Sequence, residues 1–496
     1  MKKEKSELWF ITGSQHLYGP ETLEQVNADS RTIASALDST ELIPLKVVFR
    51  PVLTSADAIT ALCLEANNSP VCAGVIAWMH TFSPAKMWIS GLRKLSKPLL
   101  HFHTQFNRDI PWNSIDMDFM NLNQSAHGDR EFGFICSRLR IERKVVVGYW
   151  QDKEVLAAIG TWARAALGAH EARSLKVVRF GDNMRDVAVT EGNKVSAQVN
   201  FDYHVHGYGV GDLVDAVSKV TEKEVAALVK QYGDEYKASA TVLASPAIKE
   251  AARIEKGMRS FLEKGGFKAF TTNFEDLHGL VQLPGLAVQR LMADGYGFGA
   301  EGDWKTAALV RIMKVMAGGL QGGTSFMEDY TYHLDPKNMS VLGAHMLEVC
   351  PSIAAGKPAL EVHPLGIGGK DDPARLVFKT RPGNAVAASL VEMGDRFRLI
   401  VNTMKVVECP EMPKLPVASV LWKPEPDLKT AAAAWIYAGG AHHTSFSQAI
   451  TADHLADYAA IAGTEFILID SGCELTRFRN ELRWNDLYYH LNKGLI

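Results

Sequence analysis

The sequence predicts an α/β protein with two parallel-sheet α/β domains, followed by a β-rich domain with an antiparallel, barrel-like sheet. Short apolar strands alternate with helical segments at the start of the chain, and the same alternation resumes in its middle. Beyond about Gly319, short strands are separated by turns. Strand–helix–strand repetition is typical of parallel sheets, whereas strands joined by short turns are typical of antiparallel sheets. We therefore predict domains over residues 1–170, 171–320 and 321–496.

The elements of the first domain are predicted from apolar runs and helix-start residues. Pro20 opens a helix, Ser55 is the expected N-cap of a second helix, and a third begins at about Pro84. The predicted strands are residues 8–12, 45–49, 74–78 and 98–102. Residues 114–123, rich in Asn, Asp and Met, are expected to be irregular.

The later elements follow from the same signals. In the middle of the chain we predict helices at 152–167 and 304–316 and strands at 175–180 and 269–272. The C-terminal domain is predicted to contain strands at 360–363, 375–378, 386–390 and 397–401, then a helix from Thr451 and a strand at 465–469.

Composition restricts the class of partner and the compartment. The formal net charge is −3 without strong clustering of either sign, which disfavours nucleic acid and a polybasic membrane surface. No apolar run reaches the length of a membrane span, so we expect a small, uncharged or weakly charged partner. The segment Met1–Glu7 is charged, with no apolar stretch of signal-peptide length, and six scattered cysteines form no CxxC pair. These features predict reduced thiols and a cytoplasmic location.

Three glycine-rich segments resemble nucleotide-binding loops but lack their fingerprints. They are residues 13–19, 207–211 and 366–370, and none has the GxGxxG or GxxxxGK[ST] form. The second and third do not clearly link a strand to a helix, so turns or close backbone approach are expected instead. A bound NAD or ATP is not indicated.

Polar and aromatic residues follow three of the predicted strands. Residues 15–18 follow the first strand, 80–82 the third and 101–105 the fourth. Open α/β sheets bind ligands beyond the carboxyl ends of their strands, so these residues suit a polyol-binding cleft. Any one of the histidines taken alone is more often structural.

Carboxylates and imidazoles recur within apolar, glycine-punctuated sequence in the second half of the chain. Such residues are seldom found there unless they are paired or bind a metal, and Glu with His makes a mixed O/N site for a divalent cation. Ordinary alternatives remain open, namely a helix-start carboxylate, a buried ion pair, a core histidine or a turn. No HExxH or EF-hand spacing occurs. The residues concerned are Glu301, Glu328, His345, His442 and His443.

Long motifs at these positions resemble the L-arabinose isomerase family over almost the whole chain. They span residues 13–23, 78–88, 103–107, 270–280, 302–307, 322–333, 345–352 and 439–444. The resemblance implies a Mn²⁺-dependent aldose–ketose isomerase, with Co²⁺ as a substitute, converting L-arabinose to L-ribulose in the cytoplasm. Action on D-galactose to give D-tagatose is also expected. The family has three domains, a fold shared with L-fucose isomerase, and a homohexamer built from two trimers.

The resemblance also implies roles for individual residues. The metal ligands fall on Glu301, Glu328, His345 and His443, with His442 as a neighbour, and the acid/base carboxylates are the same two glutamates. His127 matches a residue that reaches the site from an adjacent subunit. The remaining sugar contacts match Gln15, Leu17, Phe82, Met184, Phe274, Tyr330, Met346 and Ile367.

The residue types suit this chemistry. A Lewis-acid cation stabilises a developing enediolate, while two carboxylates exchange protons with the sugar. We hypothesise that Glu328 removes the C2 proton and that Glu301 delivers a proton at the C1/O1 side, with a metal-mediated hydride shift as the rival pathway. A sugar-binding protein would not need four such ligands together, and a nicotinamide-dependent dehydrogenase lacks its fingerprint. Both stand as alternatives.

Overall fold

The structure is a computed structural model that describes residues 6–492. Residues 1–5 of the charged N-terminal segment lie outside the described residues. One compact unit comprises the described residues up to His170 with Ala456–Ala462. The other comprises Glu171–Leu455 with the described residues from Gly463 on. The three predicted domain ranges stay predictions.

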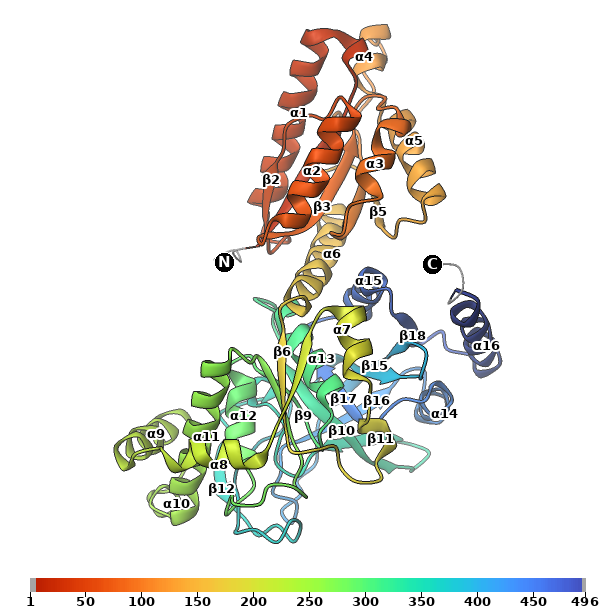
Figure 1. Cartoon of the computed structure of the whole chain (residues 1–496). Coiled ribbons are helices and arrows are strands. Elements are labelled where there is room, and N and C mark those ends of the chain that lie inside the picture. The colour runs from red at the N-terminus through yellow and green to blue at the C-terminus, as the bar shows by residue number, and fades with distance from the viewer. Residues whose placement is uncertain (1–5, 493–496) are drawn as a thin grey trace. The chain divides into compact units, whose positions relative to one another are not determined.

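The first unit is built on a parallel five-stranded sheet in the order β2-β1-β3-β4-β5. Its strands are β1 (Glu7–Gly13), β2 (Lys46–Phe49), β3 (Cys72–Met79), β4 (Leu99–His103) and β5 (Lys144–Val147). Its helical segments are η1 (His16–Tyr18), α1 (Gly19–Ser39), α2 (Ala56–Asn68), η2 (Ala85–Trp88), α3 (Ile89–Leu92), α4 (Met117–Leu122), α5 (Ser125–Arg138) and α6 (Lys153–Ala172). Figure 1 shows α1, α2, α3 and α5 around this sheet. Strand order reverses between β1 and β3, which is where open α/β sheets bind ligands.

Helix starts in this unit follow local chemistry, with one departure from expectation. Ser55 caps α2 by accepting a hydrogen bond from Ala58 N, as predicted. Residues 114–123 are not wholly irregular, because Asp116 accepts a hydrogen bond from Phe119 N and starts α4. The sequence of this short polar segment indicates α4 only through its N-cap residue, Asp116.

The second unit begins with a parallel four-stranded sheet in the order β7-β6-β8-β9. Its strands are β6 (Lys176–Phe180), β7 (His204–Tyr208), β8 (Ala269–Thr272) and β9 (Gly297–Gly299). Its helical segments are η3 (Ala188–Thr190), α7 (Lys194–Phe201), α8 (Val210–Ser218), α9 (Glu222–Glu235), α10 (Ala240–Leu243), α11 (Pro246–Gly265), α12 (Gly285–Ala293) and α13 (Trp304–Met316). The apolar faces of β6, β8, α11 and α12 enclose a buried core around Phe180, Phe270 and Met258.

A closed antiparallel sheet follows. Strands β14, β17, β10, β11, β16 and β15 pair in that order, and β14 also pairs with β15, which closes a six-stranded barrel; β18 adds a parallel strand to β15. The strands are β10 (Thr324–His333), β11 (Ser340–Ala344), β14 (Gly383–Glu392), β15 (Phe397–Val407), β16 (Ser419–Pro424), β17 (His443–Ser447) and β18 (Glu465–Ile469). The helical segments are η4 (Pro351–Ile353), α14 (Leu428–Ala438), α15 (Ala452–Ala462) and α16 (Leu475–Asn492). Two parallel sheets and a closed antiparallel sheet confirm the predicted fold class.

Some local predictions need correction. The predicted strands near 360 and 375 exist as β12 (Ala359–Val362) and β13 (Ala374–Val377), but they form a separate two-stranded sheet. The glycine-rich segment 207–211 does link a strand to a helix, because β7 ends at Tyr208 and Gly209 is the N-cap of α8. Residues 366–370 form the expected turn, with positive φ at Gly368 and Gly369.

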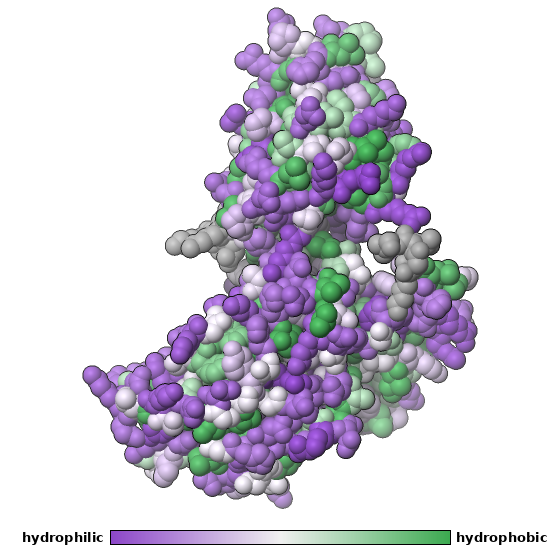
Figure 2. All heavy atoms as spheres, in the orientation of Figure 1, coloured by the Kyte–Doolittle hydropathy of each residue, from purple (hydrophilic) through white to green (hydrophobic). Residues whose placement is uncertain are grey.

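Figure 2 shows a largely hydrophilic face on which hydrophobic groups are scattered. Within residues 6–492, no helix has both the length and the apolar character needed to cross a membrane.

Candidate active site

The carboxyl edge of the central sheet positions Glu301. Met184, Phe274 and Glu301 follow strands β6, β8 and β9, and parallel strands bring their carboxyl ends to one edge. Met184 N donates to Glu301 O at 3.0 Å, which ties two of these loops together. Glu301 has φ 58° and Gly302 has φ 80°. A Cβ at Gly302 would lie 2.5 Å from Asn183 Cα, so this tight turn requires glycine.

Three barrel strands supply the other expected ligands. Glu328 on β10 lies opposite His443 on β17, and on its other side it pairs with Ala344, which His345 follows. The ring of Phe326 meets His345 and His443 edge-on, with centroid separations of 5.0 and 5.2 Å. Strand pairing and this aromatic contact therefore fix the two imidazoles beside Glu328.

The four expected ligands converge, together with His442. His443 Nε2 lies 3.6 Å from Glu301 Oε2, and His345 Nε2 lies 3.8 Å from Glu328 Oε2. His442 Nε2 is 3.7 Å from Glu301 Oε2. Donor atoms of Glu301, His442 and His443 all lie within 4.8 Å of one another. Glu328 and His345 are not members of that group, and His442, expected only as a neighbour, is.

Each buried imidazole is held by a second carboxylate. His443 Nδ1 lies 3.2 Å from Asp303 Oδ2, and His345 Nδ1 lies 2.5 Å from Glu348 Oε2. Asp303 and Glu348 are themselves buried. In both cases the opposite ring nitrogen faces Glu301 or Glu328. Metal-binding histidines characteristically have their second nitrogen bound to a carboxylate in this way.

His443 carries an unused donor atom at the centre of the site. The residue is fully buried, and its Nε2 atom has no hydrogen-bond partner among the described residues. Leaving a buried polar atom without a partner costs folding free energy. Because this nitrogen lies 3.6 Å from Glu301 Oε2, one cation could be bound by both atoms. The Glu and His donors therefore fit a divalent cation of the Mn²⁺ type.

The charges of the site are mutually stabilised. Burial raises the pKa of Glu301, but the imidazoles of His442, His443 and His345 outweigh burial and the net pKa is lowered. Burial lowers the pKa of His345, but the Glu348 carboxylate outweighs it and the pKa is raised. Asp303 keeps a pKa well below its usual range despite burial, because Lys305 Nζ lies 3.2 Å away and His443 is close. The site thus holds ionised carboxylates among imidazoles.

The supporting carboxylates belong to the same stretch of ionisable residues, but their pattern in the sequence predicts no role for them. Asp303 directly precedes the predicted helix at 304–316, and it caps α13 by accepting from Thr306 N. Its second role depends on His443, 140 residues away, and has no local signal. Glu348 follows His345 by three residues, and this His-x-x-Glu spacing was a visible signal.

The expected sugar contacts of the second unit differ in their surroundings. Phe274 and Met346 are partly buried against one apolar core, and Met184 is tied to Glu301 through its backbone. Tyr330 and Ile367 are 55% and 42% exposed. Their roles as sugar contacts stay predictions.

The first unit contains the other expected contacts, at its own strand ends. Gln15 and Leu17 follow β1, and Phe82 follows β3, on either side of the reversal in strand order. Leu17 is 81% exposed, and the ring of Phe82 meets His127 edge-on at 5.4 Å. The exposed Leu17 and the partly buried Phe82 thus lie at the switch point, a position that suits a ligand-facing role.

The histidines at the ends of β3 and β4 have structural partners instead. His80 Nε2 lies 2.8 Å from Asp29 Oδ2. His101 and His103 share Asp129 at 2.9 and 2.8 Å. Each of these histidines thus has a carboxylate partner within its own unit, as a structural histidine would, although His80 Nδ1 has no hydrogen-bond partner among the described residues.

Comparison with known proteins identifies three matching family models along the chain. The L-arabinose isomerase N-terminal domain matches residues 2–174, the central domain residues 176–319, and the C-terminal domain residues 323–465. The L-arabinose isomerase of Herpetosiphon aurantiacus is 64% identical over 494 residues, covering 99% of each chain. Those of Koribacter versatilis and Anoxybacillus flavithermus are 63% and 60% identical, covering 98% and 99% of each chain respectively.

Proposed function

Because the chain belongs to the L-arabinose isomerase family, and is therefore an isomerase, we propose that it converts L-arabinose to L-ribulose by a metal-dependent enediol mechanism. The observation that carries the metal-dependent part is the pair of carboxylate-held imidazoles that face Glu301 and Glu328.

Glu301, Glu328, His345 and His443 would hold the divalent cation, Mn²⁺ or in its place Co²⁺, which supplies Lewis-acid stabilisation of charge on the sugar oxygens. Asp303 and Glu348 keep the two ring nitrogens aimed at that position. His442 adds a third imidazole beside Glu301.

The two glutamates divide the proton transfers. Glu328 takes the proton from C2 and returns it to C1, while Glu301 takes the O2 hydroxyl proton and delivers it to O1. The carbonyl thereby moves from C1 to C2, and no proton is gained or lost overall. Phe274, an apolar contact expected in the same unit as the two glutamates, would exclude water from the intermediate.

The mechanism is tested by replacing Glu328 with Gln. Turnover of L-arabinose should be nearly abolished while circular dichroism and the unfolding midpoint stay close to those of the parent. Glu408→Gln, an exposed carboxylate of the same barrel region, is the matched control. Near-normal turnover by Glu328→Gln would contradict the role of this residue.

The enediol is distinguished from a hydride shift by isotope incorporation. Reaction in deuterated water should place solvent deuterium at C1 of the ketose, because a proton held by Glu328 exchanges with solvent. A product without deuterium would favour the hydride shift.

We extend the proposal to D-galactose, with D-tagatose as the product. The expected contacts Leu17, Met184 and Ile367 are apolar, and apolar pockets discriminate weakly between sugars that differ by one carbinol group. Ketose formation from both sugars under identical conditions would support this extension, and formation from L-arabinose alone would contradict it.

A cytoplasmic homohexamer completes the proposal. All six cysteines are free, which fits a reducing compartment. Two of the expected sugar contacts of the first unit, Leu17 and His127, are exposed, as residues that serve an adjacent subunit would be. Light scattering that reported a monomer at assay concentration would contradict the hexamer.

A further inference from the structure

The most exposed donor of the candidate site has no part in the proposed proton transfers. His442 lies between α14 and β17, directly before His443. Its side chain is 38% exposed, whereas the side chains of the four expected ligands are between 0% and 21% exposed. A cation that arrives from solvent is therefore expected to meet His442 first.

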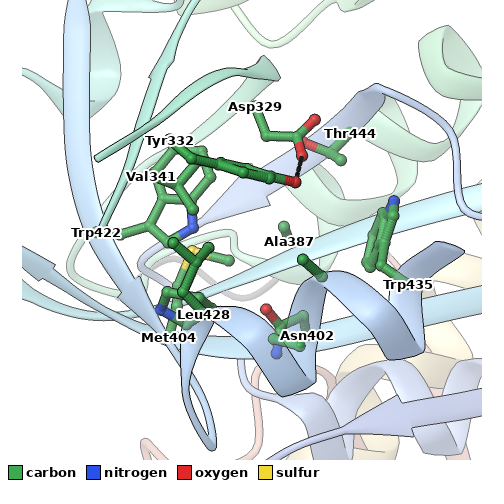
Figure 3. A pocket seen from close by; sticks show the side chains of 13 residues that line it. Asp329, Tyr332, Val341, Ala387, Asn402, Met404, Trp422, Leu428, Trp435 and Thr444 are labelled. Carbon is green, nitrogen blue, oxygen red and sulfur yellow. Dashed lines mark hydrogen bonds between the residues drawn. The ribbon is translucent and has the colours of Figure 1, made fainter. Parts of the chain in front are cut away.

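The backbone on both sides of His442 is fixed by the barrel and by α14. Trp435 Nε1 donates to Ala441 O at 2.9 Å. Trp435 and Thr444 both line a small cavity of the barrel (Figure 3). Because successive side chains of a strand point to opposite faces, Thr444 faces this cavity while His443 faces the candidate site. The two neighbouring histidines are thus held at the site by contacts that begin one residue away on each side.

The ring of His442 is held differently from the other two imidazoles. His345 and His443 are each fixed through Nδ1 by a buried carboxylate outside the expected ligand set. The carboxylate beside His442 is instead that of Glu301, an expected ligand, at 3.7 Å from Nε2. The ring also lies against His443, with centroids 4.3 Å apart. His442 is therefore positioned by the ligands themselves, which suits a donor that can bind and leave a cation.

The donor atoms of Glu301, His442 and His443 have separations near those of one coordination shell. Glu301 Oε2 lies 3.7 Å from His442 Nε2 and 3.6 Å from His443 Nε2, and donors of all three residues lie within 4.8 Å of one another. Bonds of roughly 2.1 Å to a shared cation place adjacent donors about 3 Å apart and opposite donors about 4 Å apart. Small rotations of these side chains would let one cation contact all three.

The coordination shell of the cation has room for this further ligand. The octahedral shell typical of Mn²⁺ has two more positions than the four expected ligands fill. The proposed mechanism needs those positions for sugar oxygens, but without sugar they are open. We propose, on the basis of the metal dependence proposed above, that His442 binds the cation directly in the sugar-free protein and is displaced when sugar binds.

The test compares Mn²⁺ binding by the sugar-free full chain and its variants. Calorimetry measures the affinity, and pulsed EPR counts the imidazole nitrogens bonded to Mn²⁺. His442→Ala and His442→Phe should both weaken binding at least about tenfold and remove one bonded nitrogen, although Phe keeps a ring against His443. His333→Ala, which removes an exposed imidazole at the far end of β10, should match the parent.

A second comparison tests displacement. L-Arabitol has the hydroxyl groups of the sugar but no carbonyl group, so it can bind without reacting. Adding it to the Mn²⁺-loaded parent should lower the count of bonded nitrogens by one, and the count in His442→Phe should not change. An equal count in the parent with and without bound L-arabitol would contradict displacement.

The outcomes separate this inference from the proposed function. Parent-like affinity and nitrogen count in both His442 variants, with binding lost in His443→Ala, would overturn the inference and leave the metal-dependent function standing. Parent-like binding by His442→Phe alone would show that the ring of His442 only packs against His443. If the parent bound no Mn²⁺, the metal-dependent function would fail together with the inference.

Discussion

The imidazoles of His345 and His443 are each fixed through Nδ1 by a buried carboxylate, which leaves Nε2 directed at a glutamate. The two arrangements come from different local sequences. Glu348 follows His345 by three residues, whereas Asp303 and His443 are 140 residues apart in the sequence. Different local sequences therefore hold both rings in the same way, with Nε2 directed toward a glutamate.

At this scale we predict the effect of removing Glu348. Glu348→Ala should weaken Mn²⁺ binding by roughly 10- to 100-fold, because His345 loses the partner that orients it. Glu348→Gln should retain much of the affinity, since the amide oxygen still accepts from Nδ1. Calorimetric titration with Mn²⁺ measures both, with Glu361→Ala on β12, which is in a separate sheet, as the control. Equal affinity in Glu348→Ala and the parent would show that the carboxylate does not position the histidine.

Residue identities at the candidate site were visible in the sequence, but their partners were not. Glu301, Glu328, His345 and His443 stood out because charged groups interrupted apolar sequence. The choice between a metal ligand and an ordinary ion pair depends on distances across the fold. His101 shows the other outcome, because its Nε2 atom lies 2.9 Å from the buried carboxylate of Asp129.

The first and last residues of some elements were predicted correctly from the sequence. Strands β8 and β18 and helix α13 have the predicted bounds, because each is a continuous apolar or amphipathic run with a clear start. Strand β10 was missed, since Thr324–His333 mixes apolar, acidic and aromatic residues whose pattern follows the two faces of a barrel wall. Its partner β17 comes from far along the chain, and no local pattern predicts such a register.

At the scale of the element, we predict the effect of removing the N-cap of helix α14. Asp427 caps it by accepting from Lys429 N and Thr430 N, so Asp427→Ala should cost about 1 kcal/mol of unfolding free energy. The backbone hydrogen bond from Thr430 lowers the pKa of Asp427 below its ordinary 3.8. Because the native pKa is depressed, the contribution is complete above the unfolded value and is lost as pH falls through the native one.

Chemical denaturation at neutral and acidic pH measures this difference. The gap between the parent and Asp427→Ala should narrow below about pH 4, and Asp427→Asn, which keeps the cap, should remain near the parent at both pH values. A gap that widens on acidification would refute the assigned sign.

At the scale of the molecule, the predicted fold class is confirmed, while domain ranges, assembly and metal content stay predictions. Alternation of strands and helices suffices to predict parallel sheets, and turn-separated strands suffice for an antiparallel one. Barrel closure depends on the pairing of β14 with β15 and β17, a global property that strand patterns do not specify. The sheet formed by β12 and β13 shows that correctly predicted strands can still lie outside the expected sheet.

Metal binding should stabilise the whole second unit, since its ligands come from both the central sheet and the barrel. At a Mn²⁺ concentration of 100 times the dissociation constant, the gain is about 2.7 kcal/mol. Calorimetric melting with and without Mn²⁺ measures it, and His443→Ala should remove most of the gain. An unfolding transition insensitive to Mn²⁺ in the parent would be inconsistent with a site that spans these elements.

The most direct test of the central claim is ketose formation from L-arabinose by metal-stripped full-length protein, before and after addition of Mn²⁺. We predict no ketose without metal and rapid formation with it. Ketose formed equally well without metal would contradict the metal-dependent mechanism. No ketose under either condition, with sugar binding intact, would show that the cluster of Glu301, Glu328, His345 and His443 is structural.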